Sequence, residues 1–284
     1  TGEEGEDRSA VREPVRLALG LLEKMKGPES KVRPNIVTYN AAIRVCAEGL
    51  DVRGAFRLMD EIERTEGLTP TVVTYGSLMT ACERVGSVEN ASRVFRMMKE
   101  RGGGAKDDAA IRPNEIVYGA AISACRKAGQ RERCLLLLRR MIEEGLSPNA
   151  AVFNTVVTSQ TEGREPNLDK ALVAYGLMGS KFAPRVRPNR RTYAPLVRAL
   201  AEGLRPGDAE ALLHKMRAEG LKPDVDLYTC TVASYEKTKQ PMKALRLMEY
   251  MREEGFDFYG VRVLDEAFKR AVSLANKVGE GLTG

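Results

Sequence analysis

The segments Ile36-Val-Thr-Tyr-Asn40 and Val72-Val-Thr-Tyr-Gly76 repeat one pattern at two places in a chain of 284 residues. Each segment begins two residues after a proline, and the same arrangement recurs farther along the chain. The prolines are Pro34, Pro70, Pro113, Pro148, Pro188 and Pro223, which are 36, 43, 35, 40 and 35 residues apart. An internal repeat of about 35 residues therefore organises the chain.

Three positions of the repeat keep their residue type. The fourth residue is always aromatic: Tyr39, Tyr75, Tyr118, Phe153, Tyr193 and Tyr228. Small residues recur at Ala55, Ala91, Cys134, Ala171, Ala209 and Ala244, and seven residues after each stand Ile62, Met98, Met141, Met178, Met216 and Met251. Apolar residues follow helical spacing in both halves of each repeat. Each repeat is thus predicted to form two helices with the aromatic residue packed between them, the first helix ending at Gly49, Gly86, Gly129, Gly163 or Gly203.

A single helix pair of this length cannot bury its apolar face, so successive pairs are expected to stack. The predicted fold is all-α, a right-handed-type superhelical solenoid of stacked antiparallel helix pairs. The predicted repeats are 36–71, 72–114, 115–149, 150–189, 190–224 and 225–259, after a half repeat at 15–35. Residues 1–14 are expected to be a disordered acidic tail, and residues 260–284 a C-terminal cap helix and tail.

The composition excludes several classes of protein. The chain has a single histidine, His214, and five cysteines without a CxxC pair, which argues against histidine-based catalysis, a disulfide framework and a zinc finger. Asp107 and Asp108 lie in a Gly-rich insertion and are expected to be solvated. We therefore expect no enzymatic activity, catalytic residue, metal or cofactor. No apolar run approaches the roughly 18 residues that a membrane span needs.

The charge of the chain permits binding to a polyanion. Lys and Arg number 45 against 39 Asp and Glu, so the net charge is +6, and the isoelectric point is near 9.0. Basic residues in or at the end of the predicted first helices could face phosphates or form an ordinary solvated surface, and the sequence leaves both open. They are Arg44, Arg84, Arg126, Lys127, Arg198 and Lys237. Cys46, Cys82 and Cys125 share one repeat position and are expected to be buried.

The Val-Thr-Tyr motifs, with Ala, Met and Gly in register and a closing Pro-Asn or Pro-Asp, resemble the pentatricopeptide repeat family. The resemblance covers about residues 15–259. Tetratricopeptide repeats have a period of about 34 but carry a Trp-containing signature, and this chain has no Trp. The resemblance implies an RNA-binding α-solenoid that holds single-stranded RNA, with one base facing the first helix of each repeat.

In that family the fifth and last residues of a repeat contact the base edge, and the second residue packs against the base. Carried over, the pairs are Asn40 with Thr71, Gly76 with Asn114, Gly119 with Asn149, Asn154 with Asn189, Ala194 with Asp224, and Thr229 with Tyr259. The second residues are Val37, Val73 and Ile116, then Ala151, Arg191 and Asp226. Only Asn154 with Asn189 matches a familiar pyrimidine-reading pair. The predicted RNA-binding residues are Val37, Asn40, Thr71, Val73, Asn114, Ile116, Asn149, Asn154, Asn189, Asp224 and Thr229.

The resemblance implies a non-enzymatic adaptor that occupies RNA in a concave groove and acts in organellar RNA processing, stability or translation. It implies a mitochondrial or plastid location, although no targeting peptide is visible, so a targeting segment is expected to be absent or removed. Single-stranded RNA and proteins of organellar RNA metabolism are the expected partners, without a membrane or a small-molecule substrate. Two alternatives stay open: a protein-interaction scaffold such as an organellar ribosome subunit, and the substrate-binding arm of a larger enzyme such as protein-only ribonuclease P.

Overall fold

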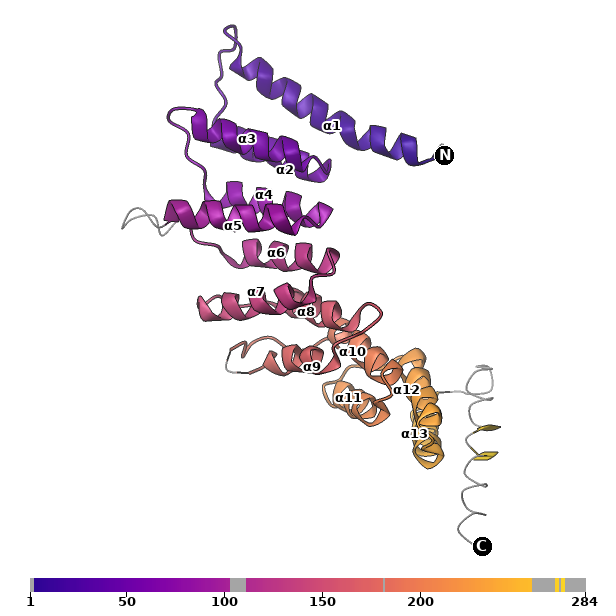
Figure 1. The fold of residues 1–284 in the computed structure, drawn as a ribbon. Helices are drawn as coiled ribbons and strands as arrows, with labels where there is room; N and C mark the ends of the chain where they lie inside the picture. Colours follow the sequence, from indigo (N-terminus) through magenta and orange to yellow (C-terminus); the bar gives the residue numbers. More distant parts are fainter. Residues whose placement is uncertain (1–2, 103–110, 181, 257–268, 271, 274–284) are drawn as a thin grey trace, which may run out of the picture. The chain divides into compact units, whose positions relative to one another are not determined.

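The fold is an all-α repeat solenoid, as predicted (Figure 1). The structure, a computed structural model, describes residues 3–102, 111–180, 182–256, 269–270 and 272–273. Within these ranges the chain forms α-helices and no strand. None of the described helices is both long and apolar enough to cross a lipid bilayer.

Each predicted repeat contains one first and one second helix. The first helices are α2 (Ile36–Glu48), α4 (Val72–Val85), α6 (Glu115–Lys127), α8 (Ala150–Thr161), α10 (Arg190–Glu202) and α12 (Val225–Lys237). The second helices are α3 (Val52–Arg64), α5 (Val88–Gly102), α7 (Arg131–Glu143), α9 (Leu168–Leu177), α11 (Pro206–Ala218) and α13 (Pro241–Glu253). Every first helix begins two residues after one of the spaced prolines, because proline disfavours a helical conformation for the residue before it.

The predicted disordered tail is wrong for residues 3–14, because they form the first half of α1 (Glu3–Lys26). The predicted C-terminal cap helix and tail at residues 260–284 lie outside the described residues, apart from residues 269, 270, 272 and 273, which are helical.

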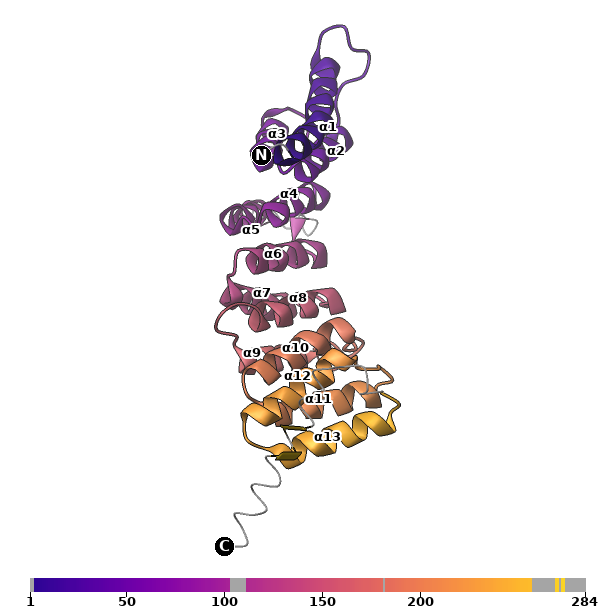
Figure 2. The same cartoon turned by 90° about the vertical axis from the view of Figure 1, so that its right-hand side faces the viewer.

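The chain divides into two compact units, residues 1–155 and 156–284. In the N-terminal unit α2 packs against α4, and α4 packs against α6, so the first helices form one layer. Each of them also packs against its own second helix, and α1 packs against α2. Figures 1 and 2 show α3 and α5 together on one side of α2 and α4. The first helices of this unit therefore share one surface and the second helices another.

In the C-terminal unit α10 is the central helix. It packs against α9, α11 and α12, and α12 packs in turn against α11 and α13. The hydroxyl groups of Tyr175 and Tyr193 lie 3.1 Å apart, and the Tyr193 hydroxyl donates to Glu219 at 2.9 Å. The packing of first helix on first helix, α10 on α12, thus matches that of the N-terminal unit.

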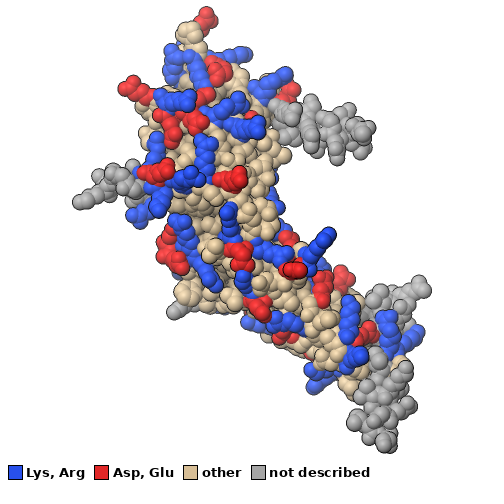
Figure 3. All heavy atoms as spheres, viewed as in Figure 1, with Lys and Arg blue, Asp and Glu red and all other residues tan. Residues whose placement is uncertain are grey.

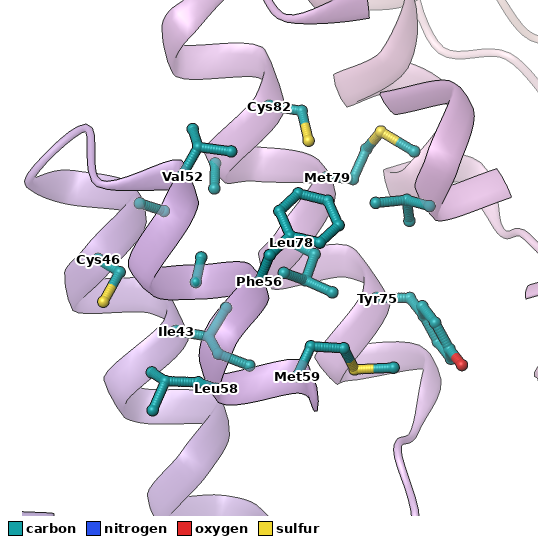
Figure 4. Close-up of a cluster of buried hydrophobic side chains, with 14 of the residues drawn as sticks. Ile43, Cys46, Val52, Phe56, Leu58, Met59, Tyr75, Leu78, Met79 and Cys82 are labelled. Atoms are coloured by element: carbon teal, nitrogen blue, oxygen red, sulfur yellow. The ribbon is translucent and has the colours of Figure 1, made fainter. Parts of the chain in front are cut away.

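The aromatic residue at the fourth position is a core residue in every repeat. Five of the six aromatic side chains have no exposed surface, and Tyr39 has 3%. Figure 4 shows Tyr75 near Leu78 and Met79, close to Phe56 and Met59. This confirms that the repeated aromatic residues hold the helices together, and they are not accessible to a base.

The predicted ends of the first helices are confirmed at Gly49, Gly86 and Gly203, which are the C-cap residues of α2, α4 and α10. Gly86 itself has the positive φ, 67°, whereas in α2 and α10 the positive φ of 56° lies at the next residue, Leu50 or Leu204. Gly49 and Gly203 stand one residue earlier with negative φ. The turn depends on the position in the repeat and not on which residue fills it, because α2, α4 and α10 end with the same backbone hydrogen bonds.

Candidate nucleic-acid interface

The second residues of the first three repeats are apolar and exposed. Val37, Val73 and Ile116 leave 69%, 65% and 68% of their surface accessible, although the aromatic residue two positions later is buried in each helix. They occupy equivalent positions on α2, α4 and α6, which pack in that order. The N-terminal unit therefore has a row of exposed apolar side chains on adjacent helices. These side chains do not belong to the core.

The fifth residues of the same repeats leave space beside this row. A Cβ atom at Gly76 would have no heavy atom within 4 Å, apart from its chain neighbours and the backbone of its own helix. A Cβ atom at Gly119 would contact Val152 at 3.5 Å. Asn40 differs because its side chain is half-buried and its Oδ1 atom is buried without a hydrogen-bond partner in the described structure. Asn40 thus keeps an unused hydrogen-bond acceptor on the first-helix layer.

The last residues of the first five repeats are helix N-caps, a role that the sequence analysis missed, and Tyr259 of the sixth repeat lies outside the described residues. Oδ1 of Asn114 accepts from the backbone N–H of Val117 at 3.1 Å, and Oδ1 of Asn149 accepts from that of Val152 at 3.0 Å. Thr71 forms a capping box with Thr74. The cap fixes the direction of each Asn amide, because its oxygen must face the helix. The NH₂ group then points away from the capped backbone N–H, so any base contact by Asn114 or Asn149 is made by a donor.

Asn35 is a further residue of this kind that the prediction omitted. It caps α2 through a capping box with Thr38, as Asn189 caps α10 with Thr192. The half repeat before Asn35 has no first helix and thus no fifth residue, so the family pattern does not assign Asn35 to a base. The signal was present in the sequence, since Asn directly before an apolar helical segment is a frequent N-cap.

The C-terminal unit presents charged groups at the second position. Arg191 on α10 and Asp226 on α12 are both exposed. Asp224 caps α12 through its Oδ1, which accepts from Leu227 N–H at 3.0 Å, and its Oδ2 accepts from Arg190 at 2.6 Å. Both carboxylate oxygens of Asp224 are therefore occupied, which leaves it poorly suited to reading a base.

The remaining predicted residues differ in their surroundings. Thr229 donates its hydroxyl hydrogen to the backbone oxygen of Val225 at 2.8 Å, so it remains an acceptor only. Asn154 lies on α8 in the N-terminal unit, whereas Asn189 lies in the C-terminal unit. Their pairing at one base therefore stays a prediction from the resemblance.

Basic side chains lie on the same first helices as the apolar row. Arg44 on α2, Arg84 on α4 and Lys127 on α6 are exposed, and none forms an ion pair within the described ranges. They carry an unneutralised positive charge on each helix of the first-helix layer. Such charges can contact phosphates while the apolar side chains and the open space at Gly76 receive a base.

The cysteines are not arranged for chemistry. Cys46, Cys82 and Cys125 are buried and free, as predicted. Burial raises the pKa of the Cys46 thiol to about 11 and that of Cys82 to about 12, so neither is a thiolate near neutral pH. No group of three His, Cys, Asp or Glu residues that could hold a metal ion occurs within the described part of the chain.

Three sequence profiles of one family match the chain. The profile described as PPR repeat family matches residues 34–84, and that described as PPR repeat matches residues 73–103. The profile described as pentatricopeptide repeat domain matches residues 9–48, 106–159 and 211–257. The matches thus fall in both units.

Two pentatricopeptide repeat-containing proteins of Arabidopsis thaliana are similar in sequence. One is 37% identical over 65 residues, which are 23% of this chain and 14% of the relative. The other, described as chloroplastic, is 28% identical over 138 residues, which are 49% of this chain and 17% of the relative. The chain therefore matches less than a fifth of the length of either relative.

Two solved structures are also similar. Pentatricopeptide repeat protein PPR10 from maize has a TM-score of 0.47 and 19% identity, over 95% of this chain and 42% of that one. The nuclear proteinaceous RNase P 2 of A. thaliana has a TM-score of 0.47 and 16% identity, over 84% of this chain and 43% of that one. With the profile matches and the repeated helix pairs, the conclusion is that the chain belongs to the pentatricopeptide repeat family.

Proposed function

We propose that the chain binds single-stranded RNA along the first helices of its N-terminal unit and acts as a non-enzymatic adaptor. The observation that carries this proposal is the row of Val37, Val73 and Ile116, exposed on adjacent helices beside the open space at Gly76. Single exposed apolar side chains are common, but burial of the core does not require a β-branched apolar side chain to be exposed at the same position of three adjacent helices. A flat base gives such a side chain a partner.

The chemistry of the neighbouring groups favours a polyanion with unpaired bases. Arg44, Arg84 and Lys127 supply a positive charge on each helix, and the NH₂ group of Asn114 supplies a donor. A double-stranded RNA would not bring its base faces to the apolar row, because they are stacked inside the duplex. The expected ligand is therefore single-stranded.

Base discrimination in this unit should be weak. Gly76 and Gly119 offer no side chain at the fifth position, so only the capping residues Asn114 and Asn149 can contact a base edge in those repeats. Most of the affinity then comes from phosphate contacts and from packing on base faces. The family and the chloroplastic relative support action in an organelle, where occupancy of an RNA would protect it or affect its processing or translation.

The proposal is tested by measuring the affinity of the chain for a labelled random single-stranded RNA pool at several salt concentrations, with a duplex of the same length as the control. Saturable binding that weakens steeply with salt and prefers the single strand is expected, since each phosphate contact releases a counterion. Binding that does not depend on salt, or an equal affinity for the duplex, would contradict the proposal. An absence of RNA binding would instead favour the protein-interaction scaffold.

The pyrimidine-reading pair has its own test. Selection from the same pool should enrich a pyrimidine at one position, and the double substitution Asn154→Ala with Asn189→Ala should remove that enrichment while leaving the salt dependence unchanged. The matched control is Asn90→Ala, because Asn90 lies on the second helix α5 and not on a first helix. If the enrichment survives the double substitution, these two residues do not read the base.

A further inference from the structure

The second helices of the first two repeats are joined by charged side chains. Arg93 on α5 reaches α3, where its guanidinium lies 3.6 Å from Asp60 and 4.6 Å from the centre of the Phe56 ring. Arg101 on α5 lies 3.7 Å from Glu63 on α3. Ion pairs and a cation–π contact thus cover the apolar surface between α3 and α5.

The next pair of second helices lacks this cover. Leu136 holds the position in α7 that Arg93 holds in α5, counted from the small residue of each repeat. The two residues of α3 that contact Arg93 are also replaced in α5, because Phe56 corresponds to Ser92 and Asp60 to Arg96. Leucine cannot form an ion pair, and Arg96 would repel a cation. Leu136 consequently leaves 61% of its surface exposed.

Two adjoining cavities open along α5 and α7. One has a volume of about 440 Å³ and the other about 210 Å³, and both are lined by Phe95 and Arg140. Leu136 and Leu137 line the smaller cavity, and Leu146 lines the larger one. We call these two cavities the α5–α7 groove. Its floor is apolar, which is characteristic of a surface that receives another apolar side chain.

The rim of the α5–α7 groove is positively charged. Among the described residues, the charged side chains that line it are Lys99, Arg112, Arg133 and Arg140 and one carboxylate, Glu144, which Arg140 already binds at 2.9 Å. Lys99, Arg112 and Arg133 form no ion pair with any described residue. Figure 3 is drawn from the side of the second helices and shows Lys and Arg, with some Asp and Glu between them, beside uncharged surface over α5 and α7. An occupant must therefore combine apolar side chains with negative charge.

We infer that the α5–α7 groove binds an acidic amphipathic segment of a partner protein. Large apolar side chains on one face of that segment would fill the space over Phe95, Leu136 and Leu137. Asp and Glu beside them would meet Lys99, Arg112 and Arg133. RNA fits less well, because it has no aliphatic group for the leucine-lined cavity. The groove lies on the second helices, so a partner bound there leaves the first-helix layer accessible to RNA.

The test uses a short fluorescein-labelled helical peptide that carries leucines on one face and glutamates on the others. We expect saturable binding by fluorescence anisotropy. Two control peptides, one with lysine in place of glutamate and one with serine in place of leucine, should bind at least about tenfold more weakly. Binding should weaken at high salt but persist, because part of it is apolar.

Two variants locate the peptide. Leu136→Arg restores the residue type of the preceding repeats and should weaken peptide binding about tenfold. Arg133→Glu reverses a charge at the rim and should weaken peptide binding by a similar factor. Val173→Arg is the matched control, since Val173 holds the equivalent exposed position on α9 and should leave binding unchanged. All three sites are exposed, and thermal unfolding checks that each variant folds.

The result that would overturn the inference is equal binding of the glutamate peptide to the wild type and to Leu136→Arg. If single-stranded RNA displaced the peptide, the groove would be part of the RNA-binding surface. If the peptide did not bind and Leu136→Arg changed the oligomeric state, the groove would be a self-association surface. Both outcomes contradict a docking site for an acidic partner. RNA affinity of Leu136→Arg is measured in parallel, so failure of the docking site is distinguished from failure of RNA binding.

Discussion

The two units of the molecule have the same scaffold but differ at the exposed position two residues into each first helix. In the N-terminal unit this position is Val37, Val73 or Ile116 and, at the end of the unit, Ala151, whereas in the C-terminal unit it is Arg191 or Asp226. The buried aromatic residue two positions later is kept in both. Folding and binding thus depend on different positions of the repeat, so a repeat can change its surface without changing its fold.

The largest expected effect concerns the shared scaffold. Tyr75→Ala in the N-terminal unit and Tyr228→Ala in the C-terminal unit should each lower the free energy of unfolding by about 3–5 kcal/mol, because each removes a fully buried ring. Denaturant unfolding measures both. A loss for one unit only would show that the two scaffolds are not equivalent.

The next effect concerns the exposed position itself. Val73→Asp should weaken binding of single-stranded RNA about tenfold, since it replaces a packing contact by a charge that repels phosphates. Asp226→Val in the C-terminal unit should strengthen it. Anisotropy titrations at one salt concentration measure both. If both substitutions weaken RNA binding, or both strengthen it, the proposed difference between the two units at this position is wrong.

The caps are expected to have a moderate effect. Asn114→Ala should cost about 1 kcal/mol of stability through loss of the cap on α6. Asn114→Asp keeps a capping acceptor but removes the amide donor, so it should leave stability nearly unchanged and weaken RNA binding. Thermal unfolding and RNA titration separate the two roles. Equal RNA affinity of the wild type and Asn114→Asp would show that this cap does not contact RNA.

A smaller effect is expected from the ion pair of Arg190 with Asp224. Asp224→Asn keeps the cap on α12 and releases Arg190, so RNA binding should become slightly tighter and its salt dependence steeper by about one phosphate contact. Arg190→Ala should do the opposite, because it leaves Asp224 unneutralised. The slope of affinity against salt concentration measures both.

The smallest effect concerns the thiols. Cys230 in the C-terminal unit is only half-buried and should react first with a thiol reagent at pH 8, whereas Cys46 and Cys82 should react slowly. Burial raises the pKa of these two thiols from the ordinary 9.0 to about 11 and about 12, so the unfolded chain loses their protons first as pH rises. Stability should therefore fall above pH 9. Mass spectrometry of partly labelled protein gives the order, and reaction of Cys46 before Cys230 would contradict it.

The sequence was sufficient to predict the helix pairs and the buried aromatic residues. Their signals are local or periodic: the prolines mark the helix starts, and the fourth residue is aromatic in all repeats. The helical state of residues 3–14 was not predicted, because acidic composition suggests disorder and a helix N-terminus equally well. The glycines that end α2 and α10 were predicted, but the positive φ lies one residue later, at Leu50 and Leu204, because the register of the turn overrides the preference for glycine.

For the candidate site, the sequence identified the residues but not the state of their polar atoms. The Asn114 amide oxygen caps a helix, and the Arg190 guanidinium donates a hydrogen bond to the Asp224 carboxylate. These contacts depend on the three-dimensional arrangement and cannot be predicted from the sequence pattern. The α5–α7 groove was also absent from the prediction. It results from Leu136 at a position that is arginine in the two preceding repeats, and the meaning of this change depends on which residues the neighbouring second helix presents.

The central claim is tested most directly by the triple variant Val37→Asp, Val73→Asp and Ile116→Asp in RNA titrations. These positions lie in the first turn of their helices, where Asp is well tolerated, as Asp226 shows in α12. Stability should therefore stay near that of the wild type, while affinity for the random single-stranded pool falls about a hundredfold. A folded triple variant that binds the pool as tightly as the wild type would contradict the claim that this row of side chains receives RNA.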